Sequence, residues 1–195
     1  MKKIGVFGGT FDPIHYGHIH LALSLKESRG IDQLFFSPNY VSPDKQESPA
    51  QATAQQRFEM LLLALEGVPG CCALDYEINR KQPSYTIDLV RYVRSSFCQK
   101  EDLLFLLMAE DLLERFASWK ESSELVKLAS PLIGSRACLQ KKGEKRDEIF
   151  EKGRENIPMI EISSTMVRNR LKNKLYCGHL VPAKVLDYIY ANKLY

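Results

Sequence analysis

Short β-type runs alternate with amphipathic helical stretches along nearly the whole chain, and this alternation constrains the fold more than any other feature. The runs expected as strands are 3–7, 33–37, 72–78, 103–108, 132–135 and 159–162. The stretches expected as helices are 17–29, 53–66, 85–97, 112–128, 144–155, 165–174 and 183–192. Such alternation builds βαβ units with right-handed crossovers and a parallel sheet covered on both faces. The sequence therefore predicts an α/β fold, a Rossmann-like doubly wound parallel sheet followed by a short C-terminal helical segment, 164–195.

The length and composition fit one domain with a sizeable core. At 195 residues the chain has the usual size of a single domain, so we expect 1–195 to form one domain with 164–195 packed on it. Apolar residues make up 45% and charged residues 26%, which excludes disorder and fibrous repeats. Ligands of a doubly wound sheet bind beyond the carboxyl ends of its strands. The residues just after each strand are therefore the candidates for function.

Charge, cysteines and hydropathy exclude several classes of protein. The net charge of +3 is too small to imply a nucleic-acid partner by itself. The basic excess in 164–195 is a separate feature, for which a solvated helix face is the alternative to a charged partner. Five cysteines without a C-x-x-C pair favour a reducing compartment and argue against structural zinc. The longest apolar run, 103–109, falls far short of the ~20 residues that cross a bilayer, and no signal peptide is visible. We expect a soluble cytoplasmic protein with no membrane partner and no nucleic-acid partner.

The end of the first expected strand carries the strongest chemical signal. Segment 8–20 reads GGTFDPIHYGHIH and holds three of the four histidines. Two glycines allow the backbone to approach a ligand closely, and His15 and His18 lie where the loop becomes a helix. Free N–H groups at a helix start bind anions and disfavour a charged imidazole. We interpret this segment as a phosphate-binding site; a tight turn with polar caps and a metal site that includes Asp12 are the alternatives.

A second segment, near the end of the chain, has the same character. Residues 162–170 read ISSTMVRNR, after an expected strand and at the start of an expected helix. One serine or threonine is enough to cap a helix, yet three stand in a row and Arg168 follows one turn later. Hydroxyls, free N–H groups and an arginine together hold phosphate oxygens. A capped helix with a surface arginine is the alternative; taken together, the two segments predict a polyphosphate ligand, which we infer to be a nucleotide.

The two segments together resemble the nucleotidyltransferase superfamily. Within it, the chain is most similar to the bacterial nicotinate-nucleotide adenylyltransferases, and the similarity runs over its whole length. Weaker matches lie at Lys45 in the proline-rich loop, at 57–60, 77–78 and 84–86, and at Trp119. The related pantetheine-phosphate branch usually has other residues where this chain has Gly9, His15 and Arg168, so these positions favour the nicotinate branch.

The resemblance implies a reaction in NAD biosynthesis. The 5′-phosphate of nicotinate mononucleotide attacks the α-phosphorus of ATP, and deamido-NAD and pyrophosphate are released. No protein nucleophile is needed, so catalysis consists of positioning and charge stabilisation. ATP and nicotinate mononucleotide are the expected partners. Mg²⁺ is expected to arrive with ATP, no metal ligand of the protein's own is expected, and the oligomeric state stays open.

The same resemblance implies roles for individual residues. The implied catalytic residues are His15 and His18. The residues implied to bind ATP are Gly8, Gly9, Thr10, Phe11, His15, His18, Lys45, Ser163, Thr165 and Arg168. The residues implied to bind the mononucleotide are Thr86, Glu110 and Trp119, with Trp119 stacked on the nicotinate ring; a place in the core is the alternative for that indole. Arg57 and Glu77 are expected to be structural partners.

Two places depart from the family's pattern. The loop usually shows Pro-His-Lys, where this chain has Pro43-Asp44-Lys45, and the fourth strand is usually followed by Gly-Ala-Asp, where it has Met108-Ala109-Glu110. Both departures concern mononucleotide recognition and leave the ATP half largely untouched. Nicotinamide mononucleotide or phosphopantetheine as acceptor, and a non-catalytic nucleotide- or RNA-binding module, are therefore kept as alternatives.

Overall fold

The computed structural model describes residues 1–43, 49–135, 148–158 and 160–195. The chain divides into two compact units, and each takes three separate segments. Unit 1 comprises Met1–Gly8, Leu21–Phe35 and Tyr85–Met159; unit 2 comprises Gly9–His20, Phe36–Ser84 and Ile160–Tyr195. The expectation of a single domain with 164–195 packed on it stays a prediction.

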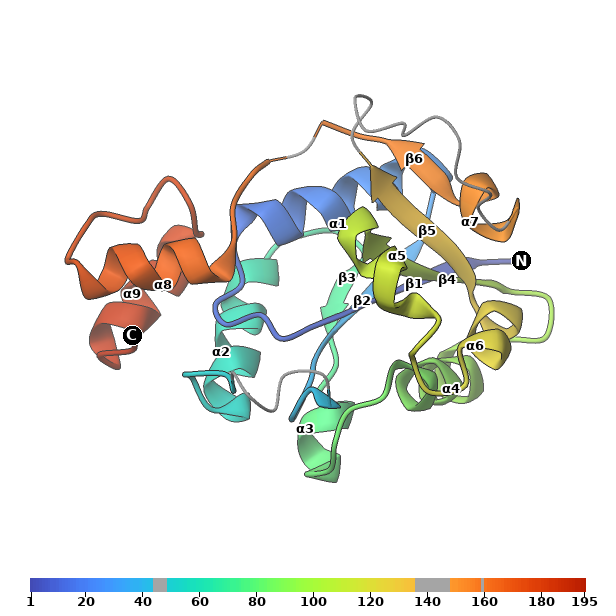
Figure 1. Ribbon diagram of the computed structural model, residues 1–195, viewed down its shortest axis with the longest axis horizontal. Coiled ribbons are helices and arrows are strands. Elements are labelled where there is room, and N and C mark those ends of the chain that lie inside the picture. Colours follow the sequence, from blue (N-terminus) through green and yellow to red (C-terminus); the bar gives the residue numbers. More distant parts are fainter. Residues whose placement is uncertain (44–48, 136–147, 159) are drawn as a thin grey trace. The chain divides into compact units, whose positions relative to one another are not determined.

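Six strands form one sheet in the order β3-β2-β1-β4-β5-β6 (Figure 1). They are β1 (Lys3–Gly9), β2 (Gln33–Pro38), β3 (Cys71–Ala73), β4 (Leu103–Ala109), β5 (Ser130–Ser135) and β6 (Arg154–Asn156). The pairs β1/β4, β4/β5 and β5/β6 are parallel. The order runs outward from β1 and then from β4, which is the doubly wound arrangement, and such sheets bind ligands beyond the strand ends where the order reverses. The predicted fold class is confirmed.

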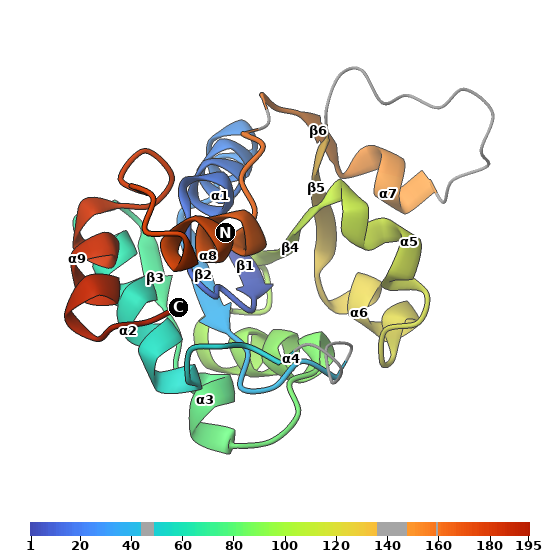
Figure 2. The same cartoon turned by 60° about the vertical axis from the view of Figure 1, so that its left-hand side comes forward.

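Helices cover both faces of the sheet in unit 1. Its helices are α1 (Tyr16–Arg29, in this unit from Leu21 on), α4 (Thr86–Phe97), α5 (Leu113–Phe116), α6 (Ser122–Leu128) and α7 (Glu148–Lys152), with a 3₁₀ turn, η2, at Glu110–Leu112. In both views α1 and α4 lie on opposite sides of β1 and β4 (Figures 1 and 2). The core between these layers includes Leu25, Val90, Leu104, Leu106 and Leu107, all buried. A nearly continuous apolar strand such as β4 is typical of a sheet covered on both sides.

Unit 2 is built around α2 (Ala54–Leu65), which packs against β3 and α9 (Ala183–Ala191). Its other helices are α3 (Tyr76–Arg80) and α8 (Ser164–Lys172). A capping box starts α2: the Thr53 hydroxyl accepts from the Gln56 N–H at 3.2 Å, and the Gln56 side chain accepts from the Thr53 N–H at 2.9 Å. The α2 and α9 helices are also joined by the Tyr188 hydroxyl, which donates to the Glu59 carboxylate.

The structure corrects the expected strand at 72–78. The strand ends at Ala73, and helix α3 begins at Tyr76. The Leu74 N–H donates to the Phe36 carbonyl at 2.8 Å, and the chain then turns so that Glu77 is buried and accepts from the Ser37 hydroxyl at 2.8 Å. A polar tertiary contact therefore overrides the apolar run that suggested a longer strand.

The last strand and the helices around it also differ from expectation. No strand occurs at 160–162; the last strand is β6, and it begins directly after Gly153. A Cβ on Gly153 would lie 2.0 Å from the Pro131 carbonyl oxygen, so only glycine allows this approach to β5. The described part of the expected helix 144–155 is α7, which stops at Lys152. The helical segments expected within 112–128 are α5 and α6, and Glu121, whose φ is +53°, lies directly before α6.

Candidate active site

The turn after β1 is held in shape by a buried phenylalanine. Phe11 has a φ of +50° and is 1% exposed. A Cβ on Gly9 would lie 2.7 Å from its ring, whereas a Cβ on Gly8 would meet only Leu89, at an ordinary 3.7 Å. Gly9 is therefore required by local packing, and Gly8 is not. The turn leads into α1 at Tyr16.

His15 is neutral and lies immediately before α1. Its carbonyl accepts from the His18 and Ile19 N–H groups at 3.0 and 3.2 Å, and its Nδ1 lies 3.3 Å from the same His18 nitrogen, as an acceptor. Burial lowers the pKa of His15 to about 4, because the interior disfavours the charged form. A neutral imidazole that accepts at Nδ1 carries its proton on Nε2. His15 is therefore set up as an uncharged donor at the start of a helix.

His18 is oriented by two aromatic neighbours. Its ring stacks on that of His15 with centroids 3.6 Å apart, and the Phe11 ring meets it edge-on at 5.1 Å. His18 thus lies in the first turn of α1 and His15 just before it, as the sequence predicts. Packing against two rings restricts the rotamers of His18 before any ligand is bound.

The start of α8 uses its hydroxyl groups in three different ways. Ser163 is the N-cap and accepts from the Met166 N–H at 3.1 Å. Ser164 donates to the Pro13 carbonyl at 3.0 Å, and Thr165 accepts from Arg168 Nη2 at 3.1 Å. The Ser163 hydroxyl therefore caps the helix, the Ser164 hydroxyl attaches the helix to the first segment, and the Thr165 hydroxyl binds Arg168 of the same helix.

Arg168 joins the two segments that the sequence singled out. Its Nη1 donates to the Asp12 carbonyl at 2.7 Å and lies 3.7 Å from the Asp12 carboxylate. These residues are 156 positions apart in the chain. The two strand-to-helix junctions are thus in direct contact within unit 2, which brings their candidate phosphate-binding groups together.

A second arginine, the buried Arg57 on α2, binds the turn that follows β1. Only 1% exposed, it donates from Nη1 to the Thr10 carbonyl at 2.6 Å and from Nη2 to the Asn39 carbonyl at 2.7 Å. Burial lowers the pKa of its guanidinium, and nearby Asp12 opposes that shift. Its Nη1 and Nη2 groups thus bind backbone carbonyls of the protein itself, which fits the expected structural role. Glu77 likewise binds Ser37.

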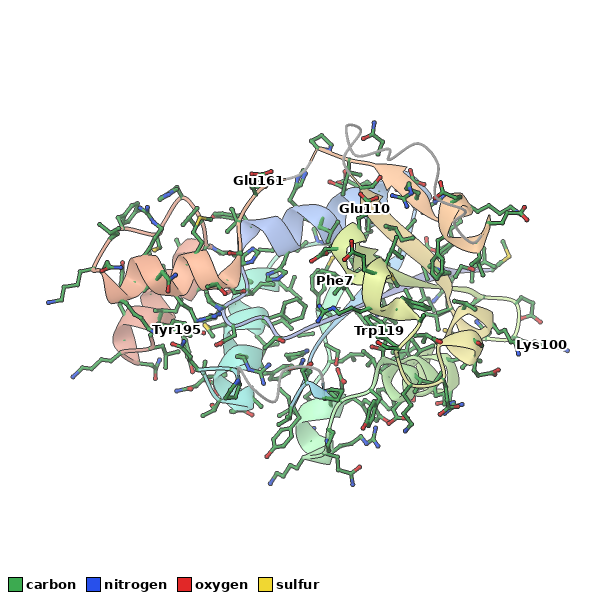
Figure 3. The ribbon with its side chains drawn as sticks, in the orientation of Figure 1. Phe7, Lys100, Glu110, Trp119, Glu161 and Tyr195 are labelled. Atoms are coloured by element: carbon green, nitrogen blue, oxygen red, sulfur yellow. The ribbon has the colours of Figure 1, made fainter. Side chains whose placement is uncertain are left out.

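The candidates for the mononucleotide all belong to unit 1. Thr86 is the first residue of α4, a helix whose N-cap residue, Tyr85, makes no side-chain cap. Glu110 and Trp119 follow β4 (Figure 3). The Glu110 carboxylate forms an ion pair with Arg154 on β6, and the half-buried Trp119 indole lies 5.2 Å from the Phe116 ring. Met108, at the family's usual glycine position, is 1% exposed.

Comparison with known proteins decides the family. Residues 6–170 match the cytidylyltransferase-like family. A probable nicotinate-nucleotide adenylyltransferase from Dictyoglomus thermophilum is 39% identical over 99% of both chains. Nicotinate-nucleotide adenylyltransferase from Bacillus subtilis is 35% identical over 100% of this chain and 99% of its own. The chain belongs to the nicotinate-nucleotide adenylyltransferases.

A solved structure shares the fold of this adenylyltransferase family member. The nicotinic acid mononucleotide adenylyltransferase of Plasmodium falciparum, complexed with NaAD, superposes with a TM-score of 0.77 and covers 99% of this chain and 97% of its own. Its sequence identity is 22%, so the agreement concerns the fold. Together with the strand order, it confirms the doubly wound sheet.

The remaining expectations concern Lys45, metal binding and the membrane, and two residues were not expected at the site. Lys45 lies outside the described residues. Within the described ranges, no group of three or more His, Cys, Asp or Glu residues is placed to hold a metal ion, and no helix is long and apolar enough to cross a membrane. Sequence reasoning missed Asn39 and Tyr195, which bind the first segment through Thr10 and Asp12. No local pattern marks either residue, because each contact exists only in the folded chain.

Proposed function

We propose that this chain transfers the adenylyl group of ATP to nicotinate mononucleotide. An oxygen of the 5′-phosphate attacks the α-phosphorus, the bond from that phosphorus to the bridging oxygen breaks, and pyrophosphate is released with deamido-NAD. The observation that carries this proposal is full-length similarity to nicotinate-nucleotide adenylyltransferases. The contact between Arg168 and Asp12 supports it, since it unites the two anion-binding helix starts.

Apart from Gly8, which belongs to unit 1, the ATP half of the proposal uses groups of unit 2. His15 donates from Nε2 to a phosphate oxygen as an uncharged group, and His18, held by two rings, stabilises the charge that develops on the transferred phosphoryl group. Backbone around Gly8, Gly9, Thr10 and Phe11 lies along the nucleotide. Ser163, Thr165 and Arg168 hold the remaining phosphate oxygens, and Lys45 is proposed to close over them.

The mononucleotide half uses groups of unit 1. Thr86 and the free N–H groups at the start of α4 take the nicotinate carboxylate, and Trp119 stacks on the ring. Glu110 is proposed to bind a ribose hydroxyl through its carboxylate.

The metal is proposed to come with the substrate. Mg²⁺ keeps most of its ligands as water and phosphate oxygen, and it neutralises charge on the triphosphate. The Asp12 carboxylate, the nearest in sequence to the histidines, already accepts from the Gln51 and Ala52 N–H groups at 2.8 and 3.1 Å. The residues present therefore fit a metal bound by ATP better than one bound by the protein.

An assay of pyrophosphate release tests the function. ATP and Mg²⁺ are supplied with nicotinate mononucleotide, nicotinamide mononucleotide or phosphopantetheine, and kcat/KM is compared. We expect the acid mononucleotide to be the preferred acceptor. Preference for either other acceptor would move the reaction to that substrate. Nucleotide or RNA binding that weakens steeply with salt and yields no turnover would indicate a binding module instead.

A further inference from the structure

The last helix ends in a turn that directs the chain back toward the first segment. The Leu194 N–H donates to the Ile189 carbonyl at 3.0 Å, and the Lys193 N–H donates to the Tyr190 carbonyl at 3.2 Å. Lys193 between them has a φ of +52°. These two bonds and the left-handed residue form a Schellman motif, which normally has glycine at that position. Lys193 thus adopts a strained backbone conformation in the turn that leads to Tyr195, which is labelled in Figure 3.

The Tyr195 hydroxyl donates to Asp12 Oδ1 at 2.7 Å, across 183 positions of sequence. Burial, the Asp12 charge and this hydrogen bond all raise the pKa of Tyr195, so the phenol stays protonated and can donate to Asp12. Asp12 is 4% exposed. Its carboxylate also accepts from the Gln51 and Ala52 N–H groups, and its carbonyl holds Arg168.

We infer that Tyr195 is a positioning residue for ATP, acting through Asp12 on the Arg168 guanidinium. This inference rests on the proposed function of Arg168. The hydroxyl keeps Oδ1 turned toward Tyr195 and the Ala52 N–H, while Arg168 lies 3.7 Å from Oδ2. Without the hydroxyl, a buried carboxylate oxygen loses a donor. The Arg168 guanidinium is then a charged donor within reach of that carboxylate, and a closer ion pair draws it away from the phosphates.

Removal of the single oxygen tests the inference. Tyr195→Phe keeps the ring and is expected to raise the KM for ATP roughly fivefold, the effect of one net hydrogen bond. The KM for nicotinate mononucleotide is expected to stay unchanged. In an Arg168→Lys background the same substitution should raise the KM for ATP no further, because the two residues act in one chain of contacts.

Tyr188→Phe is the matched control. Tyr188 lies on α9 of the same unit, and its hydroxyl also donates to a carboxylate, that of Glu59. Tyr188→Phe should lower the melting temperature about as much as Tyr195→Phe does, and it should leave both KM values unchanged. If the role of Tyr195 were purely structural, Tyr195→Phe would change both KM values together, or its effect on the KM for ATP would add to that of Arg168→Lys.

Each outcome decides the point. An unchanged KM for ATP in Tyr195→Phe, additivity with Arg168→Lys, or an unfolded Tyr195→Phe beside a folded Tyr188→Phe would overturn the inference. Calorimetric titration with a non-hydrolysable ATP analogue separates this from failure of the proposed function. If the unaltered protein releases no pyrophosphate, the proposed function fails. The expected roughly fivefold weaker binding of the analogue by Tyr195→Phe would then still support the positioning role.

Discussion

The candidate phosphate-binding groups of unit 2 and the candidate mononucleotide-binding groups of unit 1 are prepared to different degrees. In unit 2, the His15 and His18 rings stack on each other, Phe11 packs on His18, and Arg168 binds both the Asp12 carbonyl and the Thr165 hydroxyl. In unit 1, Glu110 is engaged with Arg154, and Trp119 packs on Phe116 while half-buried. Groups fixed before binding lose less entropy when the ligand arrives. The side chains with the more fixed positions therefore lie in the half that is proposed to act on the reacting phosphates.

The largest effect should come from His18→Ala. Because His18 is proposed to stabilise charge in the transition state, its loss should lower kcat by about 10²–10³-fold while the protein stays folded. Steady-state kinetics and a melting curve measure this. His20→Ala, on the same helix, is the control and should keep nearly full activity. Unchanged kcat in a folded His18→Ala protein would remove the catalytic half of the comparison.

The buried His15 should make stability depend on pH. Its pKa is lowered from 6.5 to about 4 in the folded protein, so the unfolded state binds the proton more readily. Stability is then fully present above pH 6.5 and is lost as pH falls toward 4, by up to about 3 kcal/mol. Urea unfolding between pH 7 and 4 measures the loss. His15→Gln should flatten this dependence, and an equally steep curve in that variant would contradict the assignment.

Arg168→Lys should separate the two substrates. Lysine keeps the charge but loses the planar fork that reaches both Asp12 and Thr165. We expect the KM for ATP to rise about tenfold and the KM for the mononucleotide to change little. Arg170→Lys is the control, because Arg170 lies on the same helix as Arg168 and its guanidinium binds the Tyr176 carbonyl instead. Equal changes in both KM values would erase the proposed difference between the units.

Trp119→Ala should give the opposite pattern, with the smallest effect. Loss of one stacking surface is expected to raise the KM for nicotinate mononucleotide about fivefold and leave the KM for ATP unchanged. Phe97→Ala removes an aromatic that packs on Phe35 at 4.5 Å, so it serves as a control for lost packing. If Trp119→Ala matches that control in both KM values, the indole belongs to the core.

Expected and observed structure agree best where local chemistry decides. Helix α2, expected at 53–66, begins directly after Thr53, where Thr53 and Gln56 form a capping box, and α1 ends before Gly30, whose φ is +61°. The errors lie where a distant partner prevails. The strand expected at 72–78 ends at Ala73, and the helix α3 that follows contains Glu77, which binds Ser37. The last strand is β6 instead of the strand expected at 159–162, and only glycine at 153 allows the chain before β6 to approach β5.

The amino-acid sequence by itself determined the alternating elements, the glycine pair after the first strand and the two histidines at the start of a helix. These follow from interactions over a few residues, so local pattern is enough to find them. Only the tertiary structure decided that Arg168 holds Asp12, that Arg57 carries the Thr10 carbonyl and that Tyr195 returns to the same aspartate. Such contacts form between segments brought together by burial of the core, and no short stretch of sequence encodes them.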